Sequence, residues 1–565
     1  MIKQDIKKAL AVAIHELWPN SGLAETDIEV VRPNNNQADY ANSSAFVLGK
    51  RLSSNPAEIA LKIAGALKGK IPGVNKIETA SGFINFFVTP GYLHEELLNI
   101  SKQEHYGRND SLKGKTIMVE YTDPNPFKLF HIGHLMSNTI GETIARLYTA
   151  SGAKVLRVNY QGDVGMHVAK AIWGAQQSLK ILKSGDPAVF RKILLGGGYM
   201  KGATEFEHNE QAKKEIEEIN TKLYDKSDSE INKLYKEGLS LSFEEFDRIY
   251  KKLGTKFDVK FLESEVAGDA LKIIKTHPDI FKESEGAIVF KGEDYGLHTR
   301  VFINSKGLPV YEAKELAVNK KKFDEYRPDL SVVVTGNEIN EYFKVLMKVM
   351  ELIIPDVASK TRHISHGMMR LPSGKMSSRT GDVITADSFI GQTKEKLKEI
   401  ESNETEDATR EAVAIGAIKY SILKQSPGRD IIFDFDKSLA VKGDSGPYLQ
   451  YTYARLKAIL AKAGEAISQN PDMAKLTEES ELNLIKHLLE FPDVIKESSE
   501  TLSPQHVALY DFELANLANN FYEKVYILND EDAGRMSARL LLVRVSAEVL
   551  SHGLSVLGIK TPERI

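Results

Sequence analysis

The fold is decided by the stretch KTIMVEYTDPNPFKLFHIGHLMSNTIGETIARLYTASGAKVLRVNY, residues 115–160. It begins with an apolar run at 115–122 and ends with another at 153–160, and both runs are typical of buried strands. Between them, a proline-containing loop leads into a segment with helical apolar spacing that Gly152 ends as a C-cap. Two strands joined through a helix form a right-handed βαβ unit, so the sequence predicts a parallel sheet of the Rossmann type.

A short motif, His131-Ile132-Gly133-His134, stands where this loop becomes the helix. Ligands of such sheets bind beyond the carboxyl ends of the strands, which is where the motif falls. Gly133 permits close backbone approach, the helix N-terminus attracts anions, and two imidazoles can donate to phosphate oxygens. A pattern this short also fits a helix cap or a surface feature, so it carries weight only with a second motif.

The second motif is Lys375-Met376-Ser377-Ser378-Arg379, in the loop LPSGKMSSRTGD at 371–382. A basic, hydroxyl-rich loop suits a triphosphate while pyrophosphate leaves, although a solvated surface loop has the same composition. It follows strand-like runs at 331–336 and 363–369, and a Lys- and Glu-rich segment separates it from the first motif. This order and context together favour an ATP site built from two halves of one sheet.

The chain of 565 residues is too long for one core, and its patterns predict three domains. Residues 1–108 read as a small α+β domain, because two helical patterns surround short strand-like runs. Residues 109–400 contain the sheet and a mostly helical insertion at about 175–290, and residues 401–565 read as a helical bundle. The predicted fold class is therefore multidomain α/β: a Rossmann-type parallel-sheet core with a helical insertion, a small α+β N-terminal domain and an all-α C-terminal bundle.

Composition restricts the function further. The chain has no cysteine, which excludes disulfides, thiolate zinc sites and cysteine nucleophiles and fits a reducing cytoplasm. The N-terminus reads as an amphipathic helix rather than a signal peptide, and no segment approaches the ~20 apolar residues that would span a membrane. We expect no resident metal, no membrane and no DNA partner, and the net charge of −4 leaves an RNA partner open.

The two motifs resemble the HIGH and KMSKS motifs of class I aminoacyl-tRNA synthetases. Other stretches resemble the arginyl-tRNA synthetase family, and the similarity covers nearly the whole chain, with 175–290 the weakest part. The resemblance implies a ligase that attaches L-arginine to tRNA(Arg) through an arginyl-adenylate, with ATP and Mg²⁺ as cofactors and a monomer as the expected state. The stretches that carry it are VEYTDPNPFKLFHIGHLMSNTIGE (119–142), NYQGDVGMHVAK (159–170), VYEAKELA (310–317), GPYLQYTYAR (446–455) and the terminal segment 540–565.

For ATP, the resemblance assigns phosphate binding to the two histidines and the lysine loop, and the approach of the adenosine to the glycine. The usual second lysine of KMSKS is replaced by Ser378. Either Arg379 or Lys128, which precedes HIGH as in relatives lacking that lysine, is expected to supply the cation. The expected catalytic residues are His131, His134, Lys128, Lys375 and Arg379; the expected ATP-binding residues are His131, Gly133, His134, Lys375, Met376 and Ser377.

For arginine, a guanidinium requires carboxylates and planar acceptors. The resemblance implies contacts with Glu120, Asn125, His167, Tyr311 and Glu315, the last standing where the family has Asp.

For tRNA, the resemblance implies that Phe83 and Asn85 contact an unpaired D-loop base, although Phe83 also fits a plain core residue. Tyr448, Gln450 and Tyr453 are expected to reach the anticodon stem-loop, and internal packing is the alternative for all three.

Three other interpretations fit part of the sequence. Another class I synthetase would share both motifs, but a cysteinyl enzyme needs cysteine for zinc, and glutamyl or glutaminyl substrates do not call for Glu120. A non-catalytic tRNA-binding relative should have lost HIGH or Lys375. An adenylate-forming or nucleotidyl-transferring enzyme for small molecules would not explain the terminal domains.

Overall fold

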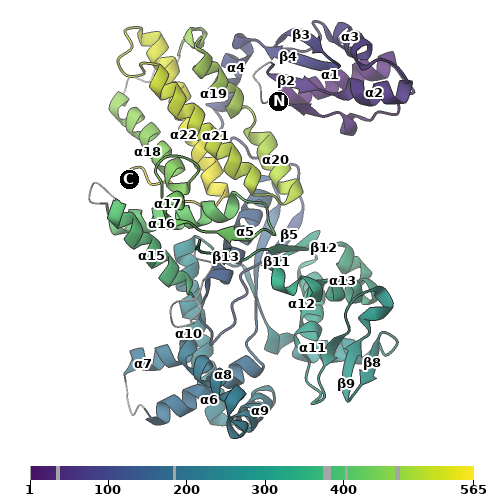
Figure 1. The fold of residues 1–565 in the computed structure, drawn as a ribbon, viewed down its shortest axis with the longest axis vertical. Helices are drawn as coiled ribbons and strands as arrows, with labels where there is room; N and C mark the ends of the chain where they lie inside the picture. Colours follow the sequence, from purple (N-terminus) through teal and green to yellow (C-terminus); the bar gives the residue numbers. More distant parts are fainter. Residues whose placement is uncertain (1, 34–37, 182–185, 373–383, 401–404, 465–470) are drawn as a thin grey trace. The chain divides into compact units, whose positions relative to one another are not determined.

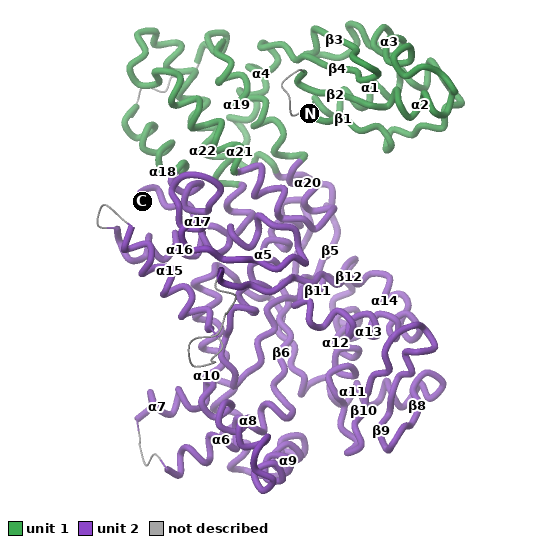
Figure 2. Tube along the Cα trace, in the orientation of Figure 1, with its two compact units in different colours: residues 1–107, 452–493, 512–552 green, residues 108–451, 494–511, 553–565 purple. Residues whose placement is uncertain are grey.

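The computed structural model describes residues 2–33, 38–181, 186–372, 384–400, 405–464 and 471–565, drawn as a ribbon in Figure 1. These residues group into two units, coloured separately in Figure 2. The first unit contains residues 1–107, 452–493 and 512–552, and the second contains 108–451, 494–511 and 553–565.

A five-stranded parallel sheet forms the core of the second unit, in the order β12-β11-β5-β6-β7. Its central strand β5 is buried, with Ile117, Met118 and Val119 at most 2% exposed. Each such side chain contributes about 1.5–3 kcal/mol to folding. The chain adds strands first on one side of β5 and later on the other, and this switch of direction opens a crevice at the carboxyl ends. The strands are β5 (Thr116–Glu120), β6 (Lys154–Gln161), β7 (Val259–Leu262), β11 (Leu330–Gly336) and β12 (Thr361–His366).

Helix α5 (Ile132–Ala150) connects β5 to β6, as the sequence predicts. It packs closely against the end of β5, since a Cβ at Gly141 would collide with the side chain of Tyr121. The helix ends before Gly152, whose φ of +89° is a left-handed conformation that favours glycine. The predicted βαβ unit is therefore present.

The inserted helices include α6 (Met166–Ile181), α8 (Gly198–His208) and α10 (Ser229–Leu253). Helices α6 and α8 cross with their backbones in contact, because a Cβ at Gly202 would collide with the carbonyl group of Lys170. The run of helices is interrupted after Leu253, within the predicted span of about 175–290, and resumes in α11 (Glu263–Lys275). The reason is β7, a four-residue strand inside a charged region, which joins the parallel sheet and is too short to produce a clear periodicity.

Two helices of the second unit bear on the site. Helix α12 (Tyr311–Tyr326) precedes β11, and α13 (Asn340–Ile353) follows it. A separate antiparallel sheet contains β8 (Phe281–Ser284), β9 (Ala287–Phe290) and β10 (Arg300–Ile303).

The N-terminal part of the first unit contains a sheet in the order β1-β2-β4-β3, in which β1 is Val30–Val31, β2 is Tyr40–Asn42 and β3 is Val74–Ala80. Its helices are α1 (Ile2–Leu17), α2 (Ser44–Leu52) and α3 (Pro56–Leu67). Strand β4 (Phe83–Val88) alternates between buried and more exposed residues. This alternation confirms the predicted strand with one buried face.

The C-terminal region is helical, as predicted. Its helices include α18 (Gly446–Ala463), α19 (Glu479–Leu488), α21 (Gln505–Lys524) and α22 (Ala533–Val556). In the first unit, buried Arg539 of α22 binds the carboxylates of Glu481 and Asp530, at 2.6 and 2.7 Å. Within the part of the chain that the structure describes, none of the helices combines the length and apolar character needed to cross a membrane.

Candidate active site

The HIGH segment lies where the carboxyl edge of the sheet meets α5. His131 is the N-cap residue of α5, and its Nδ1 accepts a hydrogen bond from the Gly133 N–H at 3.1 Å. The Nδ1 of His134 accepts from the His131 N–H at 3.2 Å. Since Nδ1 is the acceptor in both rings, each neutral imidazole carries its proton on Nε2 and is a donor there.

The charged side chains that act on these histidines are Lys128 and Glu338. Burial and the nearby Lys128 lower the pKa of His131, which Glu338 raises to a smaller extent, while burial, His131 and Lys128 lower the pKa of His134 well below its ordinary value. Both rings are therefore neutral at physiological pH and act as hydrogen-bond donors. Positive charge comes instead from the helix N-terminus and Lys128.

The loop between β5 and HIGH has an unusual backbone. Thr122, Asp123 and Phe127 all have positive φ, at 78°, 41° and 65°. Such conformations cost free energy in non-glycine residues and persist only where the surroundings fix them. The surroundings do so here, because the Phe127 N–H donates to Ser242 Oγ of α10 at 3.0 Å and Asp123 Oδ1 accepts from the Tyr160 N–H at 2.8 Å.

Lys128, predicted to replace the missing lysine, lies in this loop. Its ammonium group stands 4.7 Å from the ring centroid of Tyr199 on α8, a cation–π distance. Burial lowers its pKa. The KMSSR motif lies outside the described residues, so Lys375, Met376, Ser377 and Arg379 have no structural account here.

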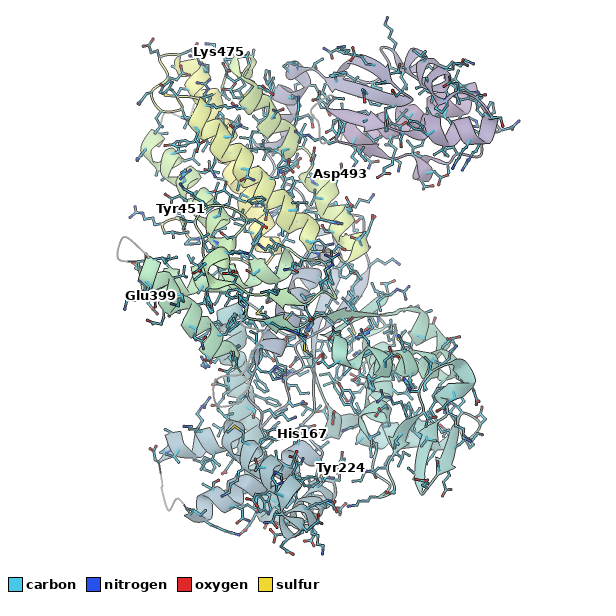
Figure 3. The ribbon with its side chains drawn as sticks, in the orientation of Figure 1. His167, Tyr224, Glu399, Tyr451, Lys475 and Asp493 are labelled. Atoms are coloured by element: carbon cyan, nitrogen blue, oxygen red, sulfur yellow. The ribbon has the colours of Figure 1, made fainter. Side chains whose placement is uncertain are left out.

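Two of the predicted arginine-binding residues, Asn125 and His167, lie around Gly162, after β6. A Cβ at this position would collide with Asn125 Oδ1 and approach Glu263 Oε1 to 3.1 Å, so glycine leaves the room that these two side chains occupy. His167 Nε2 contacts the Gly162 carbonyl oxygen at 2.7 Å, and burial lowers its pKa to about 3. Figure 3 labels His167 on α6 and Tyr224 on α9, Glu210–Asp225.

Two predicted carboxylates of the arginine site are Glu120, at the end of β5, and Glu315, on α12. They are 1% and 2% exposed. Burial and the neighbouring Glu120 raise the pKa of Glu315 to about 8. Tyr311 is 42% exposed as a whole residue, and desolvation and the nearby Glu315 raise its pKa well above the ordinary value. The predicted arginine-binding residues thus lie at one edge of the sheet.

Sequence reasoning missed four polar residues of this pocket. Glu263, directly after β7, forms a buried ion pair with Lys314 of α12. Lys322 Nζ lies 2.7 Å from Glu120 Oε2, as an ion pair without hydrogen-bond alignment, and also donates to Asn319 Oδ1 at 3.3 Å. The available signal for Glu263 was its place immediately after Val259–Leu262, where buried Val259 and Phe261 alternate with Lys260.

Phe83 and Asn85 alternate along β4 with the buried residues of that strand. The Phe83 side chain is 44% exposed and packs edge-to-face on Phe46 at 5.0 Å. Phe83 is therefore not a plain core residue, and part of its side chain is accessible to a ligand.

The three residues predicted to contact the anticodon stem-loop differ in position. Gln450 is fully buried and its Nε2 donates to the Lys560 carbonyl oxygen at 2.8 Å, so its side chain is not presented at the surface. Tyr453 is 9% exposed, and Tyr448 is half-buried. Tyr451, which sequence reasoning omitted, is 38% exposed on the same helix and is labelled in Figure 3. Gln450 was misplaced because its burial depends on the distant C-terminal segment.

Comparisons with known proteins agree along the chain. The family model described as the catalytic domain of class I tRNA synthetases (R) matches residues 96–435, the DALR anticodon binding domain matches 449–565, and the arginyl tRNA synthetase N-terminal domain matches 1–88. An arginine–tRNA ligase of Clostridium botulinum is 31% identical over 553 residues, 95% of each chain. One of Clostridium perfringens is 31% identical over 99% of this chain and all of the relative.

Solved structures share the fold. The arginyl-tRNA synthetase of Thermus thermophilus has a TM-score of 0.82 at 23% identity and covers both chains completely. That of Plasmodium falciparum has a TM-score of 0.79 at 22% identity, over 100% of this chain and 99% of that one.

The parallel sheet, with HIGH after its central strand, and the match to the family's catalytic domain define a class I aminoacyl-tRNA synthetase, a ligase that uses ATP. The predicted fold class is confirmed. Within this class, the chain belongs to the arginyl-tRNA synthetase family, as the resemblance implied.

Proposed function

We propose that this chain attaches L-arginine to tRNA(Arg) in two steps, through an arginyl-adenylate. The observation that carries the proposal is the group of buried carboxylates beside HIGH, where an ammonium-bearing, guanidinium-bearing substrate would be stabilised. The relatives named as arginine–tRNA ligases support the same substrates.

In the first step, a carboxylate oxygen of arginine attacks the α-phosphorus of ATP, and pyrophosphate leaves. In the second, a hydroxyl of the terminal tRNA ribose attacks the carbonyl carbon, and AMP leaves. No covalent nucleophile of the protein is needed, so positioning and charge stabilisation supply the rate. The Nε2–H donors of His131 and His134 bind phosphate oxygens, Gly133 lets the adenosine approach, and Lys128 supplies positive charge.

The lysine loop completes the proposed ATP site. Lys375, with Met376 and Ser377, holds the phosphates, and either Lys128 or Arg379 replaces the missing second lysine. The described donors near HIGH are imidazole, ammonium and backbone N–H groups, which suit phosphate rather than Mg²⁺, a cation that prefers oxygen ligands. Mg²⁺ is therefore proposed to enter with ATP as a counter-ion of the phosphates.

The arginine site is proposed to consist of Glu120, Asn125, His167, Tyr311 and Glu315. Glu315 is the best candidate for the guanidinium group: it is buried, and among the described residues the only hydrogen-bond donor to its carboxylate is Asn319. An ionised Glu315 would pair with a guanidinium through two parallel hydrogen bonds.

For tRNA, the exposed Phe83 and its neighbour Asn85 support stacking and edge recognition of an unpaired base. Tyr448 and the exposed Tyr451 are the proposed contacts of α18 with the anticodon stem-loop. Residues 1–108, 109–400 and 401–565 remain the proposed domains. The enzyme is proposed to act as a monomer in the cytoplasm, without DNA, and the absence of cysteine suits that compartment.

Aminoacylation of total tRNA with each labelled amino acid tests this function. We expect only arginine to give a product. A chain that charges another amino acid and not arginine would contradict the proposal. We also expect weak ATP–pyrophosphate exchange without tRNA, as the family usually requires bound tRNA for the first step, and strong exchange would contradict that part.

A further inference from the structure

We infer that Lys322 and Asn319 of α12 are positioning residues, which hold the carboxylates of Glu120 and Glu315 in the orientation that binds arginine. The inference rests on the proposed function of these two carboxylates. Neither Lys322 nor Asn319 needs to touch the substrate, because each acts through its neighbour.

The first observation is the arrangement along the helix. Glu315, Asn319 and Lys322 follow one another at spacings of four and three residues, which places them on one face of α12. All three are at most 2% exposed. A stripe of polar residues on a buried helix face is costly unless its members satisfy one another.

The second observation is that their contacts form one continuous chain. Lys322 Nζ pairs with Glu120 Oε2 at 2.7 Å and donates to Asn319 Oδ1 at 3.3 Å. Asn319 Nδ2 donates to Glu315 Oε1 at 3.2 Å and to the Glu315 carbonyl oxygen at 2.9 Å. This series of contacts therefore joins β5 to α12 and connects the carboxylates of Glu120 and Glu315.

The donors in this network fix the orientation of the Asn319 amide. An ammonium group can only donate, so Lys322 requires the amide oxygen of Asn319 on its side. The amide nitrogen must then face Glu315. Lys322 thus fixes one carboxylate directly and the other through the amide, which limits both to the positions that a ligand would meet.

The third observation is the charge balance. Two lysines, Lys314 and Lys322, lie among five carboxylates: Glu120, Asp123, Asp163, Glu263 and Glu315. Lys322 opposes the rise in the pKa of Glu315 that burial and Glu120 cause. Removal of Lys322 should therefore impede ionisation of Glu315 as well as loosen it. The titratable groups that face Glu315 are Glu120 on β5, Asp123 in the loop after it, Tyr160 on β6, Glu263 on α11 (Glu263–Lys275), Tyr311 and Lys322 on α12, and Tyr342 on α13.

The test compares Lys322→Met with Lys320→Met, a matched control on the same helix. Lys320 is exposed and pairs with Asp324 at 2.6 Å. In aminoacylation assays on the full chain, we expect Lys322→Met to raise KM for arginine about tenfold or more, with KM for ATP nearly unchanged. The rise of kcat/KM for arginine with pH should also move to higher pH. The control should behave as the wild type.

Lys322→Met leaves Glu120 unpaired, so two further variants guard against misfolding. Lys322→Met combined with Glu120→Gln removes both charges and should restore thermal stability without restoring KM for arginine. Asn319→Asp keeps the size of the side chain but replaces the donor to Glu315 with a negative charge. It should raise KM for arginine and move the pH profile in the same direction as Lys322→Met.

Two outcomes would overturn the inference: unchanged arginine kinetics in both Lys322→Met and Asn319→Asp, or equal losses for ATP and arginine that follow thermal stability. The proposed function is judged separately with Glu120→Gln and Glu315→Gln. If these raise KM for arginine while the α12 variants do not, only the positioning role fails. If they too leave KM for arginine unchanged, the assignment of the arginine site fails.

Discussion

Two groups of buried carboxylates lie in different regions of the chain and differ in their partners. In the helical bundle, Glu481 and Asp530 share the guanidinium of Arg539, and Arg535 adds two contacts to Asp530 at 2.6 and 2.8 Å. Hydrogen bonds from Arg535 lower the pKa of Asp530 to about 2. The two negative charges of this cluster are thus balanced by two arginines.

The pocket beside HIGH is not balanced in this way. Burial raises the pKa of Asp123, Glu263 and Glu315, and the described cations near these groups and Glu120 are two lysines. A fold that buries more carboxylate than cation gives up stability unless an external cation binds there. The bundle carboxylates are thus neutralised by arginines of the protein, whereas those of the proposed arginine site leave negative charge that a cationic ligand would balance.

Removal of the central cation of the bundle should have the largest effect. Arg539→Met leaves Glu481 and Asp530 buried without their shared partner, and we expect a loss of about 3–5 kcal/mol in the free energy of unfolding. Arg544→Met on the same helix is the control, because its pair with Glu548 is long, at 4.0 Å, and should cost under about 1 kcal/mol. Urea denaturation measures both. Equal losses would contradict the contrast between paired and exposed charges.

Removal of the Glu315 charge should lower activity without lowering stability, the opposite of the effect expected for Arg539→Met. Glu315→Gln should lower kcat/KM for arginine about 100-fold, since a buried guanidinium would lose its partner. Its melting temperature should be unchanged or higher, because the raised pKa means that ionised Glu315 opposes folding. Glu325→Gln, an exposed position on the same helix, is the control. A destabilised Glu315→Gln enzyme with normal arginine kinetics would reverse the comparison.

The two clusters should also respond differently to pH. Glu315, with a pKa of about 8, is protonated at lower pH and cannot pair with a cation, so kcat/KM for arginine should rise about tenfold per unit up to about pH 8. Asp530 has a depressed pKa, so its contribution to stability should persist above its unfolded pKa and disappear only as pH falls toward 2. Steady-state kinetics and denaturation midpoints across pH check both. Arginine kinetics independent of pH from 6 to 8 would contradict the first expectation.

Asp511 on α21 is a buried carboxylate outside both groups, and its substitution should have the smallest effect of those considered. It is fully buried, neither oxygen has a hydrogen-bond partner among the described residues, and burial raises its pKa well above the ordinary value. A Cβ at Gly553 would collide with its carboxyl group, so the backbone of Gly553 packs directly against it. Asp511→Asn should stabilise the chain by about 1 kcal/mol at pH 7, with more gain at pH 8 than at pH 5 and no change in arginine kinetics. A rise in KM for arginine in Asp511→Asn would mean that arginine binding also depends on a buried carboxylate outside the proposed arginine site.

The fold and the centre of the site could be predicted because their signals are local. The order of strand, loop and helix around His131 is written in one continuous stretch, and Glu120 and Asn125 fall beside it. The resemblance then extended the prediction to His167 and Tyr311, which lie after other elements of the same domain.

The remaining pocket residues could not be predicted because their roles depend on distant contacts. Glu263 pairs with Lys314 and Glu120 with Lys322, and each pair is separated by more than one intervening element of the fold. In the sequence, Lys314 and Lys322 look like ordinary charges of a solvated helix. Gln450 shows the same limit, since only the fold brings the Lys560 carbonyl oxygen to its amide.

The most direct test of the account is calorimetric binding of arginine and of citrulline, its neutral isostere, to the wild type and to Glu315→Gln. The proposed site selects a positive charge through the carboxylate of Glu315. The substitution should therefore weaken the binding of arginine about 100-fold and leave the binding of citrulline nearly unchanged. An equal loss for both ligands, or no loss for arginine, would contradict it.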